Sequence, residues 1–317
     1  MKTPDLQSRL DAYLAIREAL GIPTRAGRLL LQDFVRYVAQ HADTEPIRAR
    51  LAVDWACSAS AMRGLSGQSS RLSLARGFLT HLKASLPDTE VPESNLLCAP
   101  RRPPPYLFSA AEISRVLEAA GRLSPRGSLR PHTHQTFFGL LACTGLRSSE
   151  AIKLLVSDVQ LDEAPPRLLI HHAKFQKSRW VPLHSTAADQ LRRYAHLRRE
   201  MKYDGLSDLF FISEQGRQLD YNILQRTFRR LIQRVGLSPR PAQPHPTLHS
   251  FRHTFAVERL KQWYEAGADA RALLPNLSVY LGHVDPAATY WYLTATPELL
   301  GAAAQLFQRY TEKGGAE

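Results

Sequence analysis

Residues 249–256 read HSFRHTFA, and this stretch predicts the start of a helix with a reactive face. His249 and Arg252 are three residues apart, so a helix that begins near Thr247 places both side chains on one face. A histidine can move a proton, and the fork of an arginine can grip two phosphate oxygens at once. We therefore take His249 and Arg252 as candidate catalytic residues that act on a phosphodiester.

A metal site is the alternative interpretation of this stretch. His245, His249 and His253 recur every four residues, as ligands on one helix face would. However, Pro244 and Pro246 break the helix at His245, and the glutamate of an HExxH motif is missing. We therefore expect no metal, and we interpret His253 as a structural residue or a neighbour of the phosphate.

Downstream, a third histidine and a tyrosine complete a possible phosphoryl-transfer set. His283 lies in YLGHVDP, where the glycine permits a sharp turn, and Tyr292 follows nine residues later in TYWYL. A tyrosine hydroxyl can attack phosphorus and form a covalent ester. Tyr290 remains the alternative nucleophile, although on a helix it would point to nearly the opposite side.

Upstream, an arginine and a lysine supply two more cationic groups. Arg147 lies in TGLRSSE (residues 144–150), where Gly145 lets the backbone approach a ligand and Glu150 is spaced to cap a helix or to orient the arginine. Lys174 lies in HAKFQKSRWVPL (residues 172–183), in a turn between two expected strands. A lysine at a hairpin tip can protonate a leaving oxygen, and Lys177 in the same turn is the alternative.

These motifs, in this order, resemble the tyrosine recombinase (phage integrase) family over roughly residues 105–300. TGLRSSEAIKL resembles the first arginine box of the family, HSFRHTFA resembles its HxxR box, and the interval between the last histidine and the tyrosine matches its spacing. Aligning RWVPL on the family pattern places the catalytic lysine at Lys174. The resemblance implies a catalytic set of six residues, namely Arg147, Lys174, His249, Arg252, His283 and the nucleophile Tyr292.

The activity that the resemblance implies is DNA strand cleavage and rejoining through a 3′-phosphotyrosyl intermediate, with no metal, ATP or other cofactor. TYWYLTATPELL resembles the C-terminal motif of transposon-encoded members, which favours integration or excision of a mobile element. A Xer-like resolvase, a type IB topoisomerase-like strand transferase and a non-catalytic DNA-binding regulator remain alternatives. The family works as a tetramer, so we expect a homo-tetramer on DNA, possibly with related recombinases.

Composition points to the same partner. The formal net charge is +12 and the pI is near 9.9, which favours nucleic acid over an anionic membrane surface, and the resemblance implies that this nucleic acid is double-stranded DNA. Most of the 41 basic residues are arginines, although a GC-rich genome could also produce that bias. An apolar leader and a long apolar run are both missing from the sequence. We expect a bacterial protein of the cytoplasm and nucleoid, with no membrane partner.

The chain is expected to fold as two α-rich domains. Residues 1–86 read as four short amphipathic helices, which the resemblance identifies as a SAM-like core-binding bundle. Residues 87–105 form a proline-rich linker, and residues 106–317 form a mixed α+β catalytic domain with a small antiparallel sheet. Strands are expected at 167–172, 179–183 and 209–212. Basic residues expected to contact DNA are Arg48, Arg71, Arg76, Arg101, Arg102, Lys177 and Arg179.

The end of the chain carries a further amphipathic segment. Residues 297–310 place Leu299, Leu300, Leu306 and Phe307 on one face of an expected tail helix. Such a face needs a partner. We expect it to dock onto a neighbouring protomer, or else to fold back on its own domain.

Overall fold

The structure is a computed structural model that describes residues 3–22, 24–41, 46–58, 60–94, 96–97, 103–173, 177–239, 243–282 and 287–295. The chain divides into two compact units, Met1–Arg102 and Pro103–Glu317. Each unit has its own hydrophobic core.

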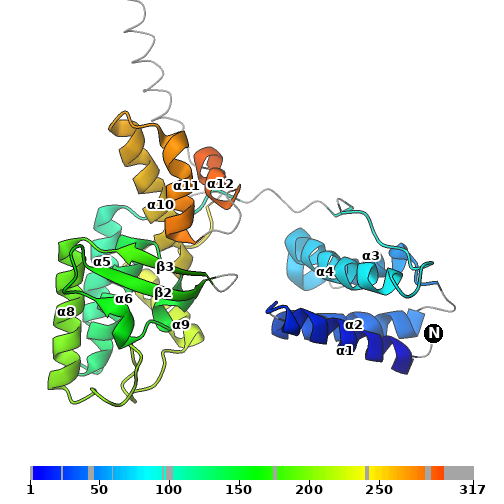
Figure 1. The fold of residues 1–317 in the computed structure, drawn as a ribbon, viewed down its shortest axis with the longest axis horizontal. Coiled ribbons are helices and arrows are strands. Elements are labelled where there is room, and N and C mark those ends of the chain that lie inside the picture. The colour runs from blue at the N-terminus through cyan, green and yellow to red at the C-terminus, as the bar shows by residue number, and fades with distance from the viewer. Residues whose placement is uncertain are drawn as a thin grey trace, which may run out of the picture. The chain divides into compact units, whose positions relative to one another are not determined.

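The first unit is a bundle of four helices, as the apolar periodicity predicts (Figure 1). The helices are α1 (Thr3–Ala19), α2 (Arg25–His41), α3 (Ala49–Ser58) and α4 (Ser60–Lys83). Their apolar faces meet around Phe34, Trp55 and Phe78, which are almost fully buried. After α4 the chain returns to the start of α3, where the Glu90 carboxylate accepts a hydrogen bond from the backbone nitrogen of Ala49. The first residues of the proline-rich segment are therefore attached to this bundle.

The second unit combines helices with a small antiparallel sheet (Figure 1). Its strands lie in the order β1 (Val159–Gln160), β2 (Arg167–Ala173) and β3 (Lys177–Pro182). The hairpin of β2 and β3 matches the two strands predicted from the sequence. The third predicted strand, at 209–212, is wrong, because within this run only isolated bridges form, from Leu209 to Leu155 and from Ile212 to Gln218.

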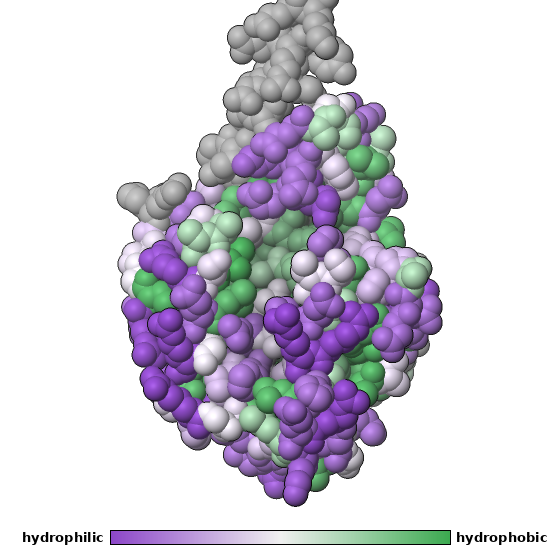
Figure 2. All heavy atoms as spheres, turned by 90° about the vertical axis from the view of Figure 1, so that its left-hand side faces the viewer, coloured by the Kyte–Doolittle hydropathy of each residue, from purple (hydrophilic) through white to green (hydrophobic). Residues whose placement is uncertain are grey.

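Helices make up the rest of the unit and form most of its core. They are α5 (Ala110–Gly121), α6 (Leu129–Thr144), α7 (Ser148–Ile152), α8 (Ser185–Glu200), α9 (Tyr221–Arg234), α10 (Leu248–Glu265), α11 (Ala270–Leu281) and α12 (Ala287–Ala295), with a 3-10 turn η1 at Val156–Asp158. Helix α6 packs against α5, α8 and α10. Phe137, Phe138, Phe228 and Phe251 fill the space between them with edge and stacked ring contacts. Hydrophilic residues predominate on the surface seen in Figure 2, and apolar ones show only in patches between them.

A smaller core joins the last three helices of the unit. Helices α10, α11 and α12 bury Val257, Leu260, Leu274, Leu277 and Tyr292 against one another. This packing is what brings the tyrosine helix next to the HSFRH helix.

Local signals set the helix ends. Ser109 and Glu112 form the predicted capping box at the start of α5, with hydrogen bonds of 3.2 and 2.8 Å. Gly145 ends α6 in the left-handed region at φ 63°, and Thr247 is the residue before α10, both as predicted.

Candidate active site

The Arg147 side chain is held by hydrogen bonds to a carboxylate and to a backbone carbonyl. It directly precedes α7, and the Glu150 carboxylate accepts hydrogen bonds both from the Arg147 backbone nitrogen (3.0 Å) and from its Nη1 (2.9 Å). The Nη2 of Arg147 donates to the carbonyl oxygen of Gly282 at 2.9 Å. Glu150 therefore fills both roles expected for it, the helix cap and the orientation of the arginine.

Arg252 lies deeper, only 1% exposed, on the inner side of α10. Its Nη1 donates to the Gly145 carbonyl at 2.9 Å, and its Nη2 donates to the Leu281 carbonyl at 2.6 Å. Arg147 and Arg252 are thus held by consecutive carbonyls at the end of α11. Burial, followed by the positive charge of Arg147, lowers the pKa of Arg252 to about 10, so its guanidinium still carries its charge at neutral pH.

Arg179, on β3, connects the hairpin to Glu150 and to the end of α11. Its Nη1 and Nη2 donate to the two Glu150 oxygens at 3.1 and 2.9 Å, and its Nε donates to the Tyr280 carbonyl at 2.8 Å. Both charged side chains are under 10% exposed. Burial alone would raise the pKa of Glu150, but hydrogen bonds and charge from Arg179, and then from Arg147, hold it below its ordinary value.

A glycine makes room for this bridge. Gly282 adopts φ 67°, and a Cβ there would lie 2.7 Å from the Nη1 of Arg179. The start of α7, the hairpin and the end of α11 at Gly282 consequently meet around Glu150 and its two arginines.

Tyr292 points into the unit from α12 and is 2% exposed. Its hydroxyl lies 3.0 Å from the Nδ1 of His253, one residue beyond Arg252 on α10. The ring of His249 stands edge-on to that of His253, with 4.5 Å between centroids. By contrast, Tyr290 is 45% exposed. The structure thus brings Arg147, Arg252 and Tyr292 to the neighbourhood of the α10–α12 core.

Some predicted site residues lie outside the described part of the chain. They are the two catalytic candidates Lys174 and His283, the linker arginines Arg101 and Arg102, and the tail at 297–310. Lys174 follows the last residue of β2, and His283 follows the last described residue after α11.

The remaining DNA-contact candidates differ in their surroundings. Arg48 is an exposed side chain paired with Glu90, whereas Arg76 is half-buried on α4 and Lys177 begins β3. Arg71 lies inside the first unit with its guanidinium 3.9 Å from the Trp55 ring centre, and its Nη2 donates to the Trp55 carbonyl. Such a contact stabilises the bundle. That these residues contact DNA stays a prediction.

Sequence reasoning missed two residues of this neighbourhood. Arg179 was interpreted as a DNA contact, and its bond to Glu150 has no local signal because the two are 29 residues apart. The sequence predicts His253 to be a structural residue or a neighbour of the phosphate, and its bond to Tyr292 has no local signal because the two are 39 residues apart.

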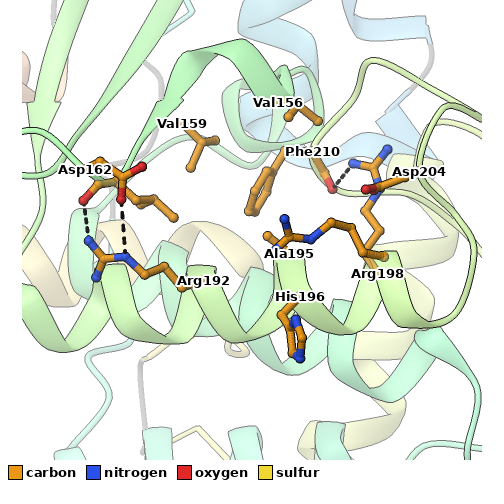
Figure 3. A pocket seen from close by; sticks show the side chains of 11 residues that line it. Val156, Val159, Asp162, Arg192, Ala195, His196, Arg198, Asp204 and Phe210 are labelled. Atoms are coloured by element: carbon orange, nitrogen blue, oxygen red, sulfur yellow. Dashed lines mark hydrogen bonds and ion pairs between the residues drawn. The ribbon is translucent and has the colours of Figure 1, made fainter.

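A separate cavity of about 670 Å³ is lined by none of the predicted catalytic residues. Figure 3 shows Arg192 beside Asp162 at one end and Arg198 beside Asp204 at the other, with Phe210 between them. The buried Arg198 donates to the carbonyls of Ser207, Leu209 and Phe210 at 2.7, 2.6 and 3.1 Å. This side chain therefore holds the loop after α8 in place, which explains its burial.

Two other kinds of feature, a metal site and a membrane-spanning helix, are absent from the described ranges. No group of three or more His, Cys, Asp or Glu side chains there is arranged to hold a metal ion. None of the helices in the described part of the chain combines the length and apolar character that crossing a bilayer requires.

Comparison with known proteins gives consistent matches. The model of the phage integrase family matches residues 108–298, more than half of the chain. The protein y4rB of Sinorhizobium fredii, named as an integrase/recombinase, is 39% identical over 308 residues, which cover 96% of this chain and 97% of y4rB. The tyrosine recombinase XerC of Bacillus subtilis is 28% identical over 63% of this chain and 60% of its own.

Solved structures share the fold. The XerH site-specific recombinase, in a post-cleavage complex with its difH substrate, superposes with a TM-score of 0.68 at 18% identity, over 89% of this chain and 78% of its own. The Tn1549 transposon integrase in complex with transposon right end DNA superposes with a TM-score of 0.66 at 16% identity, over 98% and 99%.

Proposed function

The chain belongs to the phage integrase family and is a tyrosine recombinase, an enzyme that breaks and rejoins DNA, and from this premise we propose that Tyr292 is its nucleophile. The tyrosine attacks a phosphodiester of double-stranded DNA and holds the cut strand as a 3′-phosphotyrosyl ester. The catalytic set is Arg147, Lys174, His249, Arg252, His283 and Tyr292.

The observation that carries this proposal is the pairing of two distant arginines at one turn. Arg147 and Arg252 are bound to the carbonyls of Gly282 and Leu281, and Tyr292 lies on the next helix. Two guanidiniums held this way can neutralise the non-bridging oxygens of one phosphate and the charge that builds on them during attack.

The proposed step breaks one bond and makes one. As the Tyr292 oxygen bonds to phosphorus, the bond from phosphorus to the 5′-oxygen breaks, and that oxygen takes a proton from Lys174, the proposed general acid. The phenol gives up its own proton to a water molecule, so that one proton is released for the one that Lys174 donates. Because the ester retains the phosphodiester linkage energy, attack by another 5′-hydroxyl reverses the step and rejoins DNA without ATP.

A covalent-capture experiment tests the proposal. Wild-type protein is mixed with fragmented DNA, denatured, and the DNA that stays attached is sequenced, which also yields the target site. A nicked suicide substrate built on that site should then trap the wild-type protein and not Tyr292→Phe, which keeps everything but the attacking oxygen. Tyr290→Phe is the matched control and should trap normally. A DNA-binding regulator would give no adduct with any of the three.

We further propose that the substrate sites are the ends of a mobile element, and that four copies act together on DNA. The C-terminal motif TYWYLTATPELL supports the first point. Recovered sites at element ends support this assignment, whereas a single chromosomal site would favour a Xer-like resolvase. Relaxation of supercoils without strand exchange would favour a topoisomerase-like activity.

A further inference from the structure

His253 lies against the nucleophile, yet the chemistry proposed above does not use it. We propose that His253 is a positioning residue: its Nδ1 accepts a hydrogen bond from the Tyr292 phenol and holds the oxygen in the orientation from which it attacks phosphorus. This inference rests on the proposed function, because it assumes that Tyr292 is the nucleophile.

The geometry around His253 supports a fixed imidazole. Its Nδ1 is 3.0 Å from the Tyr292 oxygen, and the two rings meet at 63° with 5.5 Å between centroids. The ring of Trp291, next to Tyr292 on α12, has its centroid 5.6 Å from that of His253. The ring of His249 stands edge-on to that of His253, with 4.5 Å between centroids. Three rings therefore contact the imidazole, so its orientation is set by packing as well as by the hydrogen bond.

The position on α10 matters because that helix also holds the phosphate-binding candidate. His253 directly follows Arg252, whose guanidinium is tied to two backbone carbonyls and is 1% exposed. A rigid helix turn thus links the group that binds the phosphate to the group that holds the nucleophile. Tyr292 itself lies on a short helix of nine residues, and the hydrogen bond to His253 ties it to α10 as well.

A hydrogen bond of this kind has a direct effect on attack. A buried tyrosine hydroxyl requires a partner, and the partner decides where its lone pairs point. With the ring proton on Nε2, Nδ1 accepts from the phenol and leaves the oxygen lone pairs turned away from the imidazole. Errors of about 1 Å in such a placement reduce a reaction rate by roughly 100-fold.

The alternative is that His253 only fills space, and side-chain geometry distinguishes the two. The amide oxygen of asparagine is the same number of bonds from Cβ as Nδ1 is, whereas the polar end of glutamine matches Nε2. His253→Asn therefore keeps an acceptor for the phenol, while His253→Gln and His253→Ala do not. Thermal unfolding and DNA affinity of each variant establish that it is folded and binds.

The test measures the rate of adduct formation on the suicide substrate carrying the recovered site. We expect His253→Ala and His253→Gln to slow the rate by roughly 10- to 100-fold, and His253→Asn to recover most of it. A second substrate carries sulfur in place of the 5′-bridging oxygen. A thiol has a pKa near ~8.5, so the thiolate leaves without a proton donor. That substrate should restore the rate of adduct formation by Lys174→Ala, which lacks the proposed acid. It should not restore the rate of His253→Ala, because the defect of that variant is at the nucleophile.

The outcomes are separable. The positioning role is overturned if His253→Ala forms the adduct at the wild-type rate, or if sulfur restores the rate of His253→Ala. It is also overturned if the Asn variant reacts at the same rate as the Ala variant or as the Gln variant. Failure of the wild-type protein to form any adduct overturns the proposed function, and this inference with it.

Discussion

At the scale of single residues, Glu150 connects the groups on which the site depends. It accepts hydrogen bonds from Arg147 and from Arg179, and its side chain is only 8% exposed. A buried carboxylate between two guanidiniums is stabilising only while both partners remain, since an unpaired buried charge costs several kcal/mol. The orientation of the Arg147 side chain therefore depends on a carboxylate that it shares with Arg179.

Glu150→Gln should lower both stability and cleavage. We expect a loss of about 3 kcal/mol in the free energy of unfolding near neutral pH, because Arg179 and Arg147 lose a charged partner. Glu118→Gln, in an exposed pair with Arg122, is the control and should cost under about 1 kcal/mol. If denaturant unfolding gives the same loss of free energy for both substitutions, Glu150 contributes no more to stability than the exposed Glu118 does.

The pairing of Glu150 with its two arginines also predicts how the stability of the protein changes with pH. The folded-state pKa of Glu150 is below its ordinary value of 4.5, so the unfolded state binds the proton first as pH falls. The stability it contributes is fully present above pH 4.5 and is lost as the pH falls through the lower folded-state pKa. The difference in melting temperature between wild type and Glu150→Gln should therefore shrink on acidification through this range. A constant difference would contradict the assignment.

Arg179→Lys separates positioning from DNA contact. Lysine keeps the charge but loses the two-point bond to Glu150 and the bond to the Tyr280 carbonyl. We expect cleavage to fall by roughly 10- to 100-fold while DNA affinity changes little. Arg48→Ala, which removes an exposed guanidinium of the first unit, should show the opposite pattern in the same binding and cleavage assays. Weakened binding by Arg179→Lys would instead support the DNA contact predicted from the sequence.

At the scale of elements, the end of α6 decides whether Arg147 and α10 can approach each other. Gly145 has φ 63°, and a Cβ there would lie 2.7 Å from the Phe255 Cδ1 on α10. Its carbonyl accepts the hydrogen bond from Arg252. A side chain at this turn would therefore push the end of α6, and Arg147 two residues after it, away from α10 and Arg252.

Gly145→Ala should be more destabilising than Gly127→Ala. Both glycines have positive φ, so both substitutions incur the left-handed penalty of about 1 kcal/mol. Only the first meets a neighbour, because nothing lies within 4 Å of a Cβ at Gly127. We expect an additional loss of about 1–3 kcal/mol at Gly145, together with slower cleavage. Equal unfolding energies for the two variants would argue against the close approach.

At the scale of the whole molecule, charge dominates the expected behaviour. A net charge of +12, rich in arginine, implies that binding to DNA releases condensed counterions. Affinity for DNA should fall by roughly 1,000-fold or more between about 50 and 200 mM salt if six or more phosphates are contacted. Fluorescence anisotropy with a labelled duplex over this range measures the slope. A flat response would rule out an extended phosphate interface.

The elements that could be predicted from the sequence alone depend on interactions between residues close together in the chain. Apolar periodicity predicted the four helices of the first unit, and hydrophobic runs around a polar turn predicted the hairpin of β2 and β3. The caps at Ser109 and Gly145 depend on residues within a few positions, so they could be predicted without knowledge of the fold. The predicted strand at 209–212 is wrong because an apolar run also suits a buried loop, whose backbone carbonyls here accept hydrogen bonds from the Arg198 side chain.

Tertiary structure alone decided which charged and polar side chains far apart in the sequence face one another. Arg71 and Arg179 look like surface cations in the sequence, but the fold buries one on Trp55 and the other on Glu150. Arg179 meets the Tyr280 carbonyl across 101 residues, and His253 meets Tyr292 across 39. Contacts this distant depend on how whole helices pack, and helix packing is set by the summed burial of many apolar side chains. No local pattern around an arginine or a histidine carries that information.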